Sequence, residues 1–307
     1  MRIVDPTPQN IQAAADALLD GQLVVIPTET VYGLAADAGN LAAVQAVFAA
    51  KGRPADNPLI VHIGSNEWME DLAVEVPAVA RTLAERFWPG PLTLVLKKKA
   101  LVLPEVTGGL DTVAVRMPAH PVALELIRSA GIPLAAPSAN QFTNLSPTRA
   151  QNVDPEIAAR AEMVLDGGPC EVGLESTVVD CTTDPIRILR PGRISQKDIE
   201  VATGVLPLLG SEVSHRSPGQ YPRHYAPKTP VCLVPKLAAE QGGLVLSELT
   251  NPSQVLMPSD PVAYAALLYE TLHDLDNVGL SQIFVEMPPA TPEWTAVWDR
   301  LKKASTP

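Results

Sequence analysis

Short apolar runs alternate with helix-length segments over the first two thirds of the chain, and this alternation limits the choice of fold more than any other feature. The expected strands lie at 22–27, 58–63, 92–98, 112–117, 132–137, 162–166, 176–180 and 186–190. The expected helices lie at 8–20, 41–51, 77–88, 120–130 and 195–203. Because strands and helices alternate at first and the later strands are spaced as in hairpins, the pattern predicts an α/β fold. Its sheet is expected to be twisted and mixed, parallel and antiparallel, with helices.

A second alternating set begins after residue 230. Its apolar runs are VCLVP, GLVLSE, SQVLMP and QIFVEM, with helices expected near 261–275 and 292–303. Thr291 and Pro292 form a typical helix start, a capping side chain followed by proline. We therefore expect a larger domain over 1–205, a linker over 206–230 and a small Rossmann-like α/β domain over 231–307.

The composition is typical of a globular protein. Hydrophobic residues make up 46% of the 307 residues, enough for a buried core, and no apolar run approaches the ~18 residues of a membrane span. The first ten residues lack the basic-then-apolar pattern of a secretory signal. Three widely spaced cysteines give neither a disulfide framework nor a metal-binding spacing. These observations predict a globular cytoplasmic protein with free thiols.

Charge is unevenly distributed along the chain. The net charge of −11 argues against a protein that binds nucleic acid over its whole surface. Between Glu212 and Glu240, however, the chain has four Lys or Arg and no Asp or Glu. This window contains the stretch SPGQYPRHYAP, which carries two tyrosines, an arginine and a histidine that a passive linker does not need.

The sequence lacks the common nucleotide-binding and hydrolase motifs GxxxxGK[ST], GxGxxG, HExxH and GxSxG. Polar residues instead follow the apolar strands. In PTETVYGL, Thr28, Thr30 and Tyr32 are expected to line a cleft at the carboxyl edge of the sheet, and an ordinary turn is the alternative. In KGRPADNP, Lys51 and Arg53 beside stiffening prolines suit a phosphate or carboxylate, and a solvated helix end is the alternative.

Three further stretches raise the same choice between a binding role and a structural one. Strand alternation in TVAVRMP puts Arg116 on an apolar strand, where it either reaches an anion or extends to water, and His62 in PLIVHI is similar. Hydroxyl and amide groups that suit a ribose or phosphate occur in APSANQFTNLSPT, at Ser138, Asn140, Ser146 and Thr148. Ser176 begins a strand and Arg190 ends one, and both positions also fit ordinary strand termini.

The stretches occur in the order PTETVYGL, KxRP, PLxVHI, WPGPLT, VAVRxP, APSAN, ESTVVD and RPG. This order, which runs across nearly all of residues 8 to 203, closely resembles the L-threonylcarbamoyladenylate synthase family, whose catalytic part is the YrdC-type domain. SPGxxxxHYAP joined to a second α/β domain resembles the two-domain members. The resemblance implies a YrdC-type sheet with a concave, positively charged groove. The second domain, with 77 residues from 231 to 307, is shorter than expected for that form.

The resemblance implies that the chain makes threonylcarbamoyl-AMP and pyrophosphate from L-threonine, bicarbonate and ATP. The product supplies a group placed on the adenosine beside the anticodon of certain tRNAs, so downstream threonylcarbamoyl-transfer proteins are expected partners. Mg²⁺ is expected to bind through the ATP phosphates, with no metal ligands from side chains. Strong binding of bare tRNA is not expected, because residues 1–205 hold 16 Lys or Arg and 24 Asp or Glu, a net of −8.

The resemblance also implies site residues. For threonine they are Thr30, His62, Arg116, Ala136 and Ser176. For ATP they are Arg53, Asn57, Thr112, Ser138, Asn140, Ser146, Arg190, Arg223, His224 and Tyr225. Lys51 and Arg53 are the expected catalytic residues, with Lys51 placing bicarbonate and the polyphosphate. The positive linker is expected to close over the groove as a lid that excludes water, with a plain tether as the alternative.

Three other functions are alternatives to the synthase activity. An RNA-binding module is disfavoured by the negative charge. A carbamoyltransferase of hydrogenase maturation also contains a YrdC-type domain, but it should bring zinc-finger cysteine pairs and an acylphosphatase-like segment, and this sequence has neither. A relative that keeps the fold without the activity is disfavoured by the intact KxR and SAN motifs and the linker.

Overall fold

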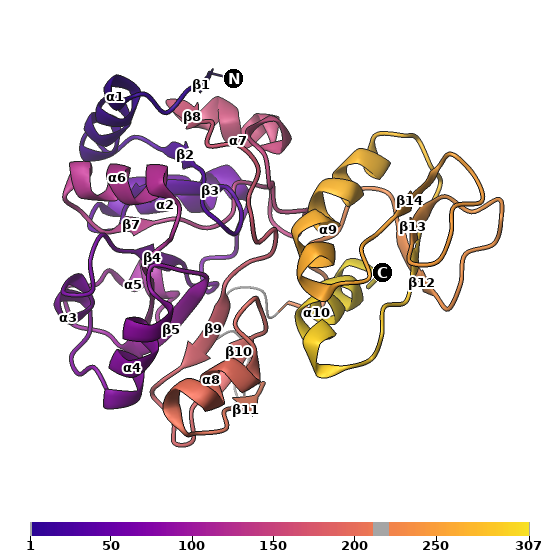
Figure 1. Cartoon of the computed structure of the whole chain (residues 1–307). Helices are drawn as coiled ribbons and strands as arrows, with labels where there is room; N and C mark the ends of the chain where they lie inside the picture. The colour runs from indigo at the N-terminus through magenta and orange to yellow at the C-terminus, as the bar shows by residue number, and fades with distance from the viewer. Residues whose placement is uncertain (1, 211–220, 307) are drawn as a thin grey trace.

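The computed structural model describes residues 2–210 and 221–306, and it has two parts of unequal size (Figure 1). Within these residues the larger part holds a sheet of eleven strands and the smaller part a sheet of four. Helices α9 and α10 of the smaller part lie between its sheet and the larger part (Figure 1). Residues 217–220 of the SPGQYPRHYAP stretch lie outside the described residues.

The larger sheet is mixed and has the order β1-β8-β2-β3-β7-β4-β6-β5-β9-β10-β11. Its strands are β1 (Ile3–Val4), β2 (Val24–Ile26), β3 (Gly33–Asp37), β4 (Ile60–His62), β5 (Leu92–Lys97), β6 (Thr112–Arg116), β7 (Leu134–Ala135), β8 (Met163–Leu165), β9 (Thr177–Asp180), β10 (Arg187–Arg190) and β11 (Leu208–Leu209). The central pair β4 and β6 is parallel, with His62 beside Arg116 in the register. Antiparallel partners β7 and β5 flank this pair.

Helices cover the larger sheet. They are α1 (Pro8–Leu19), α2 (Leu41–Lys51), α3 (Trp68–Leu72), α4 (Ala78–Phe87), α5 (Pro104–Thr107), α6 (Pro121–Ala130), the 3₁₀ turn η1 (Ala150–Asn152), α7 (Pro155–Arg160) and α8 (Gln196–Thr203). The side chain of Asn40 accepts hydrogen bonds from the first amides of α2, and Gly52 ends the helix with a φ of 57°. This sharp ending places Lys51 and Arg53 on either side of a turn that leaves the helix.

The smaller sheet is entirely parallel, in the order β12-β15-β13-β14. Its elements are β12 (Val231–Val234), β13 (Gly243–Val245), β14 (Gln254–Leu256), α9 (Pro261–Asp276), β15 (Ile283–Glu286), the 3₁₀ turn η2 (Pro292–Trp294) and α10 (Thr295–Ala304). The predicted fold class, a mixed sheet with helices followed by a small α/β unit, is confirmed.

An apolar interface joins the two parts. Val31, Leu145 and Leu174 of the larger part belong to the same buried cluster as Leu268 and Tyr269 of α9.

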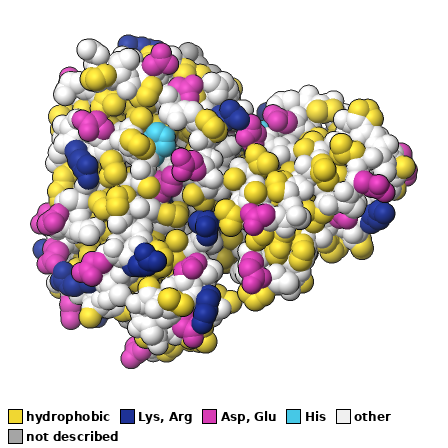
Figure 2. Space-filling view, in the orientation of Figure 1, with side chains coloured by type: hydrophobic (Ala, Val, Ile, Leu, Met, Phe, Trp, Pro, Cys, Tyr) yellow, Lys and Arg dark blue, Asp and Glu magenta, His cyan; other side chains and the backbone are white. Residues whose placement is uncertain are grey.

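On the face shown in Figure 2, Lys and Arg side chains are scattered among Asp and Glu over both parts. In the part of the chain that the structure describes, no helix is long and apolar enough to cross a membrane.

The predicted helices and strands are confirmed with small changes at their ends, while several short elements were missed. Strand β3 was not predicted, since its sequence GLAAD lacks β-branched residues, yet it pairs with β2 and β7. The two-residue strands β1 and β11 and the helices α3, α5 and α7 were also missed, because segments of two to six residues carry almost no periodic signal. The helix expected from Thr291 begins as a 3₁₀ turn, without a capping bond from the threonine side chain.

Candidate active site

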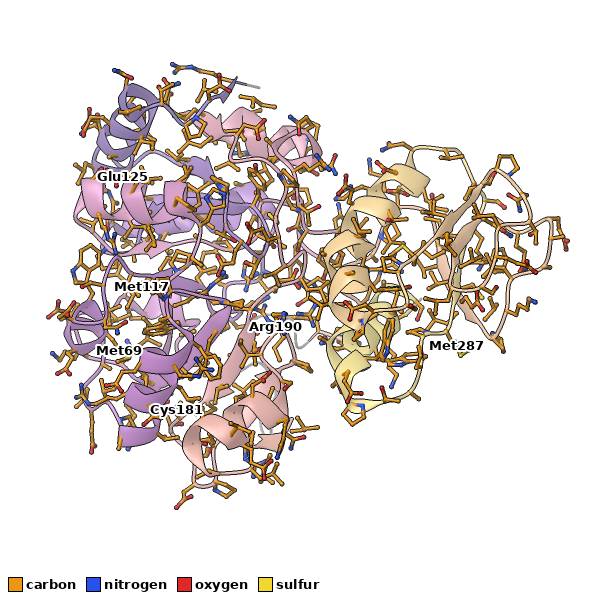
Figure 3. The ribbon with its side chains drawn as sticks, viewed as in Figure 1. Met69, Met117, Glu125, Cys181, Arg190 and Met287 are labelled. Carbon is orange, nitrogen blue, oxygen red and sulfur yellow. The ribbon has the colours of Figure 1, made fainter. Side chains whose placement is uncertain are left out.

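One pocket of the larger part gathers side chains from segments far apart in the sequence. All five residues expected for threonine line it, namely Thr30, His62, Arg116, Ala136 and Ser176. So do five of those expected for ATP, namely Arg53, Ser138, Arg190, His224 and Tyr225. Arg190 lies on the side of the larger part that faces α9 and α10 (Figure 3). The sheet register explains part of this convergence, since neighbouring His62 and Arg116 project to the same face.

Arg116 is held by three contacts at one end of this pocket. Its Nη1 donates to Oγ1 of Thr30 at 2.9 Å, and its Nε donates to the carbonyl of Gly90 at 3.2 Å. Its Nη2 forms an ion pair with Oε1 of Glu29 at 2.7 Å, with both side chains buried. Glu29 of PTETVYGL was not predicted as a site residue, because an acidic side chain gives no sign of a site for anionic substrates. The guanidinium is therefore fixed in direction before any ligand binds.

His62 is neutral in this environment. Burial, together with the positive charge of Arg116, lowers the pKa of the imidazole to about 3. A histidine with so low a pKa is a weak base at neutral pH, so its suitable role is a hydrogen bond to a ligand.

Tyr32 does not line the pocket as predicted. Its side chain is fully buried, and its hydroxyl donates to the carbonyl of Gly168 at 2.7 Å. The turn at 28–31 reverses the chain direction into β3, so the tyrosine packs into the core while Thr28 and Thr30 stay at the pocket.

Two buried arginines supply positive charge to the pocket. Arg53 donates from Nε and Nη2 to the carbonyls of Asn57 (3.1 Å) and Pro58 (2.8 Å), and from Nη2 to Oδ1 of Asn57 (2.6 Å). Burial lowers the pKa of Arg53 to about 10, which leaves it cationic at neutral pH. Arg190 donates to the backbone and side-chain oxygens of Ser176, at 3.0 and 3.1 Å.

Five of the residues expected for ATP do not line the pocket, namely Asn57, Thr112, Asn140, Ser146 and Arg223, which is described with the linker below. Asn57 orients Arg53, as described above, and Thr112 lies at the start of β6, paired with Lys97. Asn140 donates to the carbonyls of Gln141 and Asn144, and Ser146 donates to Oε1 of Glu175 at 2.6 Å. The side chains of Asn57, Asn140 and Ser146 thus hold loop segments and pocket residues in place.

Lys51 also lies behind the pocket wall. Its buried Nζ donates to the carbonyls of Ser138 and Asn140, the latter at 2.5 Å. Burial and the charge of Arg53 lower the pKa of Lys51 well below its ordinary value. The lysine thus ties the end of α2 to the APSAN loop.

The linker closes the pocket through two consecutive residues. His224 and Tyr225 are both buried and line it, whereas Arg223 is exposed and donates from Nη1 to the carbonyl of Thr306 at 3.0 Å. The rings of Tyr221 and His224 pack against Phe142, at centroid distances of 5.1 and 5.7 Å. The remaining cavity volume is about 50 Å³, room for a few water molecules only. A ligand of the size of a nucleotide therefore fits only if the linker takes another position.

Comparisons with known proteins agree along the whole chain. A family model described as telomere recombination (Sua5, YciO and YrdC) matches residues 16–192, and one described as threonylcarbamoyl-AMP synthase, C-terminal domain, matches residues 194–306. The threonylcarbamoyl-AMP synthase of Pyrococcus abyssi is 42% identical, over 96% of this chain and 94% of that protein. The chain belongs to the threonylcarbamoyl-AMP synthase family. The Bacillus subtilis member is also 42% identical, over 97% and 93% of the two chains.

A solved structure of a family member has the same fold. The crystal structure of P. abyssi Sua5 complexed with L-threonine matches with a TM-score of 0.91 at 40% identity, covering 99% of this chain and 96% of that one.

A second buried carboxylate, that of Glu175, was also not predicted from the sequence. Glu175 lines the pocket and pairs with Arg300 of α10, Oε2 to Nε, at 2.8 Å. Burial alone would raise the pKa of this carboxyl, but the charges of Arg300 and Arg190 outweigh burial and hold it at about 2. The sequence gives no signal for the pair, because its partners lie 125 residues apart in different parts of the molecule.

The described residues do not fit a metal ion held by side chains. They contain no group of three His, Cys, Asp or Glu that could coordinate one. Both carboxylates next to the pocket, Glu29 and Glu175, already pair with arginines.

Proposed function

We propose that this chain makes threonylcarbamoyl-AMP and pyrophosphate from L-threonine, bicarbonate and ATP. The observation that carries the proposal is one pocket in which the side chains proposed to bind threonine lie together with the buried cations Arg53 and Arg190. The overall charge of −11 is unfavourable for anionic substrates, so local cations of this kind are required. The product serves the threonylcarbamoyl modification of tRNA beside the anticodon.

Threonine binds at the end of the pocket where Arg116 is fixed. Its carboxylate accepts hydrogen bonds from the guanidinium, while Thr30, neutral His62 and Ser176 contact the rest of the amino acid. The backbone at Ala136 completes the wall. The contacts of Arg116 with Glu29 and Gly90 support this role, since they orient the arginine in advance.

Two steps complete the reaction. The threonine nitrogen attacks the carbon of bicarbonate, a C–N bond forms, and hydroxide leaves as water after taking a proton. A carbamate oxygen then attacks the α-phosphorus of ATP, and the bond to the bridging oxygen breaks to release pyrophosphate. Arg53 and Arg190, joined by His224 and Tyr225 of the closed linker, stabilise charge across the α- and β-phosphates. Catalysis then rests on positioning and charge neutralisation.

Lys51 is proposed to place bicarbonate and the polyphosphate when the linker opens and the APSAN loop rearranges. In the same rearranged state, four further residues are proposed to contact ATP, namely Asn57, Thr112, Asn140 and Ser146. Arg223 is proposed to reach ATP only in a closed state with nucleotide bound. Mg²⁺ enters as the substrate complex MgATP. The division into a catalytic domain over 1–205, a lid over 206–230 and a small domain over 231–307 belongs to the same proposal.

The labile product is handed to downstream threonylcarbamoyl-transfer proteins. The mixed charge of the face in Figure 2 supports a protein that does not itself bind bare tRNA strongly. A gel shift with bare tRNA at low and physiological salt tests this point. A tight, salt-dependent shift would favour the RNA-binding alternative.

The test of the activity is pyrophosphate release from ATP and bicarbonate with and without L-threonine, together with mass spectrometry for threonylcarbamoyl-AMP. We expect threonine-dependent release and a product of that mass. ATP and threonine binding without release would overturn the proposal in favour of a fold retained for binding alone.

A further inference from the structure

The smaller part of the molecule reaches the active site through one buried arginine. Arg300 of α10 is 1% exposed, and its Nε donates to Oε2 of the pocket residue Glu175 at 2.8 Å. The guanidinium also lies over the ring of Tyr225, with Cζ 4.8 Å from the ring centroid. Arg300 itself does not line the pocket. It therefore contacts two pocket residues, one from the larger part and one from the linker, without facing the ligand.

Glu175 connects this arginine to a residue proposed for ATP. Its Oε1 accepts from Ser146 at 2.6 Å, and its Oε2 accepts from the hydroxyl of Tyr269 in α9 at 3.0 Å. A single carboxylate thus joins the larger part to both helices of the smaller part. Both oxygens of this buried carboxylate are hydrogen-bonded, which restricts its movement.

The linker needs such support because Tyr225 adopts an unfavourable backbone conformation. Its φ is 58°, in the left-handed region that bulky residues rarely occupy. On one side its neighbour Ala226 donates to the carbonyl of Thr143 at 3.0 Å. On the other, the amide of His224 donates to the carbonyl of Lys303, next to Arg300 on α10, at 3.4 Å.

The hydroxyl of Tyr225 is buried and has no hydrogen-bond partner among residues 2–210 and 221–306. Tyr225 therefore lines the pocket with a hydroxyl that no described residue engages.

We propose that Arg300 is a positioning residue that holds Tyr225 over the nucleotide side of the active site, so that the C-terminal part sets the closure of the linker. The inference rests on the proposed function for the identity of the ligand that Tyr225 meets. Its physical claim, that Arg300 holds the linker closed, does not depend on the reaction.

The first experiment measures hydrogen exchange of residues 221–226 in the full-length protein without ligands. Arg300→Met keeps side-chain volume but removes the nearer cation from the Tyr225 ring and leaves Nζ of Lys303 at 5.9 Å from the ring centroid. We expect exchange there to accelerate at least about tenfold. Arg149→Met is the matched control, because Arg149 pairs with Glu270 at 2.5 Å between the same two parts and belongs to no proposed ligand contact. The control should leave exchange at 221–226 unchanged.

The second experiment separates positioning from a loss of structure. Because threonine is proposed to bind at the Arg116 end, R300M should raise KM for ATP at least about tenfold and keep the affinity for threonine measured by calorimetry. R300K, which keeps a cation over the ring, should recover part of the ATP effect. If R300M fails to fold because Glu175 is left as an unpaired buried charge, E175Q/R300M removes that charge and is compared with E175Q.

Wild-type exchange rates at 221–226 in R300M, or equal effects of R300M and R149M, would overturn the inference. A wild-type protein that releases no pyrophosphate would overturn the proposed function alone, since the exchange experiment would still decide the role of Arg300.

Discussion

At the scale of single residues, two buried acid–arginine pairs flank the pocket and have different consequences. Glu29 and Arg116 pair within the larger part, beside Thr30, and fix the direction of the arginine. Glu175 and Arg300 pair across the two parts of the molecule. Since each carboxylate is compensated by its own partner, Arg53 and Arg190 remain to offset the charge of an anionic ligand.

Replacement of Arg116 by methionine should lower kcat/KM for threonine by a factor that corresponds to about 2–4 kcal/mol of transition-state stabilisation. The physical reason is the loss of charged hydrogen bonds to the substrate carboxylate. Steady-state pyrophosphate release at varied threonine measures the change. Because R116M leaves Glu29 as a buried unpaired charge, E29Q/R116M serves as the folding control. A variant whose kcat/KM stays within threefold of wild type would remove Arg116 from the threonine site.

Glu175 should make stability depend on acidity in a defined window. Its folded-state pKa of about 2 lies below the ordinary value of 4.5, so its contribution is complete above about pH 4.5 and is lost as the pH falls towards 2. The full contribution is on the order of 3 kcal/mol. Denaturant unfolding between pH 6 and pH 3 should show a steeper loss of stability for wild type than for E175Q. Parallel pH profiles would mean that the carboxyl is not held ionised by Arg300.

Three cations that lie at the pocket could be predicted from the sequence, but the two buried carboxylates beside it could not. Arg53, Arg116 and Arg190 stand out because a charged residue at the end of an apolar strand or helix needs an explanation. Glu29 and Glu175 sit in turns, where acidic residues are common, and only the tertiary structure shows that both are buried.

At the scale of elements, the linker segment 221–226 acts as the wall that closes the pocket. It is fixed to the loop at 142–144 by aromatic contacts and by the pairing of Asn144 with Ala226. Helix α10 holds its other side. These contacts involve few residues, so the segment can open locally at a smaller cost than unfolding a domain.

Linker closure should weaken as the pH falls. Burial lowers the pKa of His224 to about 3 in the closed state. The positive charges of Arg53, Lys51 and Arg190 also lower this pKa, while the negative charge of Glu175 opposes them. In an open linker the pKa returns towards about 6.5, so between pH 6.5 and 3 protonation favours opening, by up to about tenfold per pH unit. Hydrogen exchange at 221–226, corrected for intrinsic rates, should therefore be faster at pH 5.5 than at pH 7.5. In His224→Phe the pH effect should disappear, and its persistence there would assign it to another group.

Elements of ten or more residues could be predicted from their caps and periodicity, as α1 and α2 show through Thr7, Asn40 and Gly52. Strand β3 could not, since its sequence GLAAD becomes a strand only because β2 and β7 offer it partners. The place of the linker on the larger part could be proposed from its composition. The contacts that hold it there could not, because Arg300 and Phe142 carry no local signal.

At the scale of the whole molecule, the smaller part completes the site and does not merely follow it in sequence. Its helices α9 and α10 face the larger part (Figure 1), and Tyr269 and Arg300 reach Glu175 at the pocket. The apolar cluster that spans both parts makes their relative placement part of the fold. The short C-terminal domain thus has a structural task in the synthase reaction, the support of a closed linker.

The measurement that tests the account most directly is pyrophosphate release by the full-length chain with ATP and bicarbonate, with and without L-threonine, followed by mass spectrometry of the product. The account predicts release that depends on threonine and a product with the mass of threonylcarbamoyl-AMP. Release that is the same without threonine, or no release from a protein that binds both ATP and threonine, would contradict it.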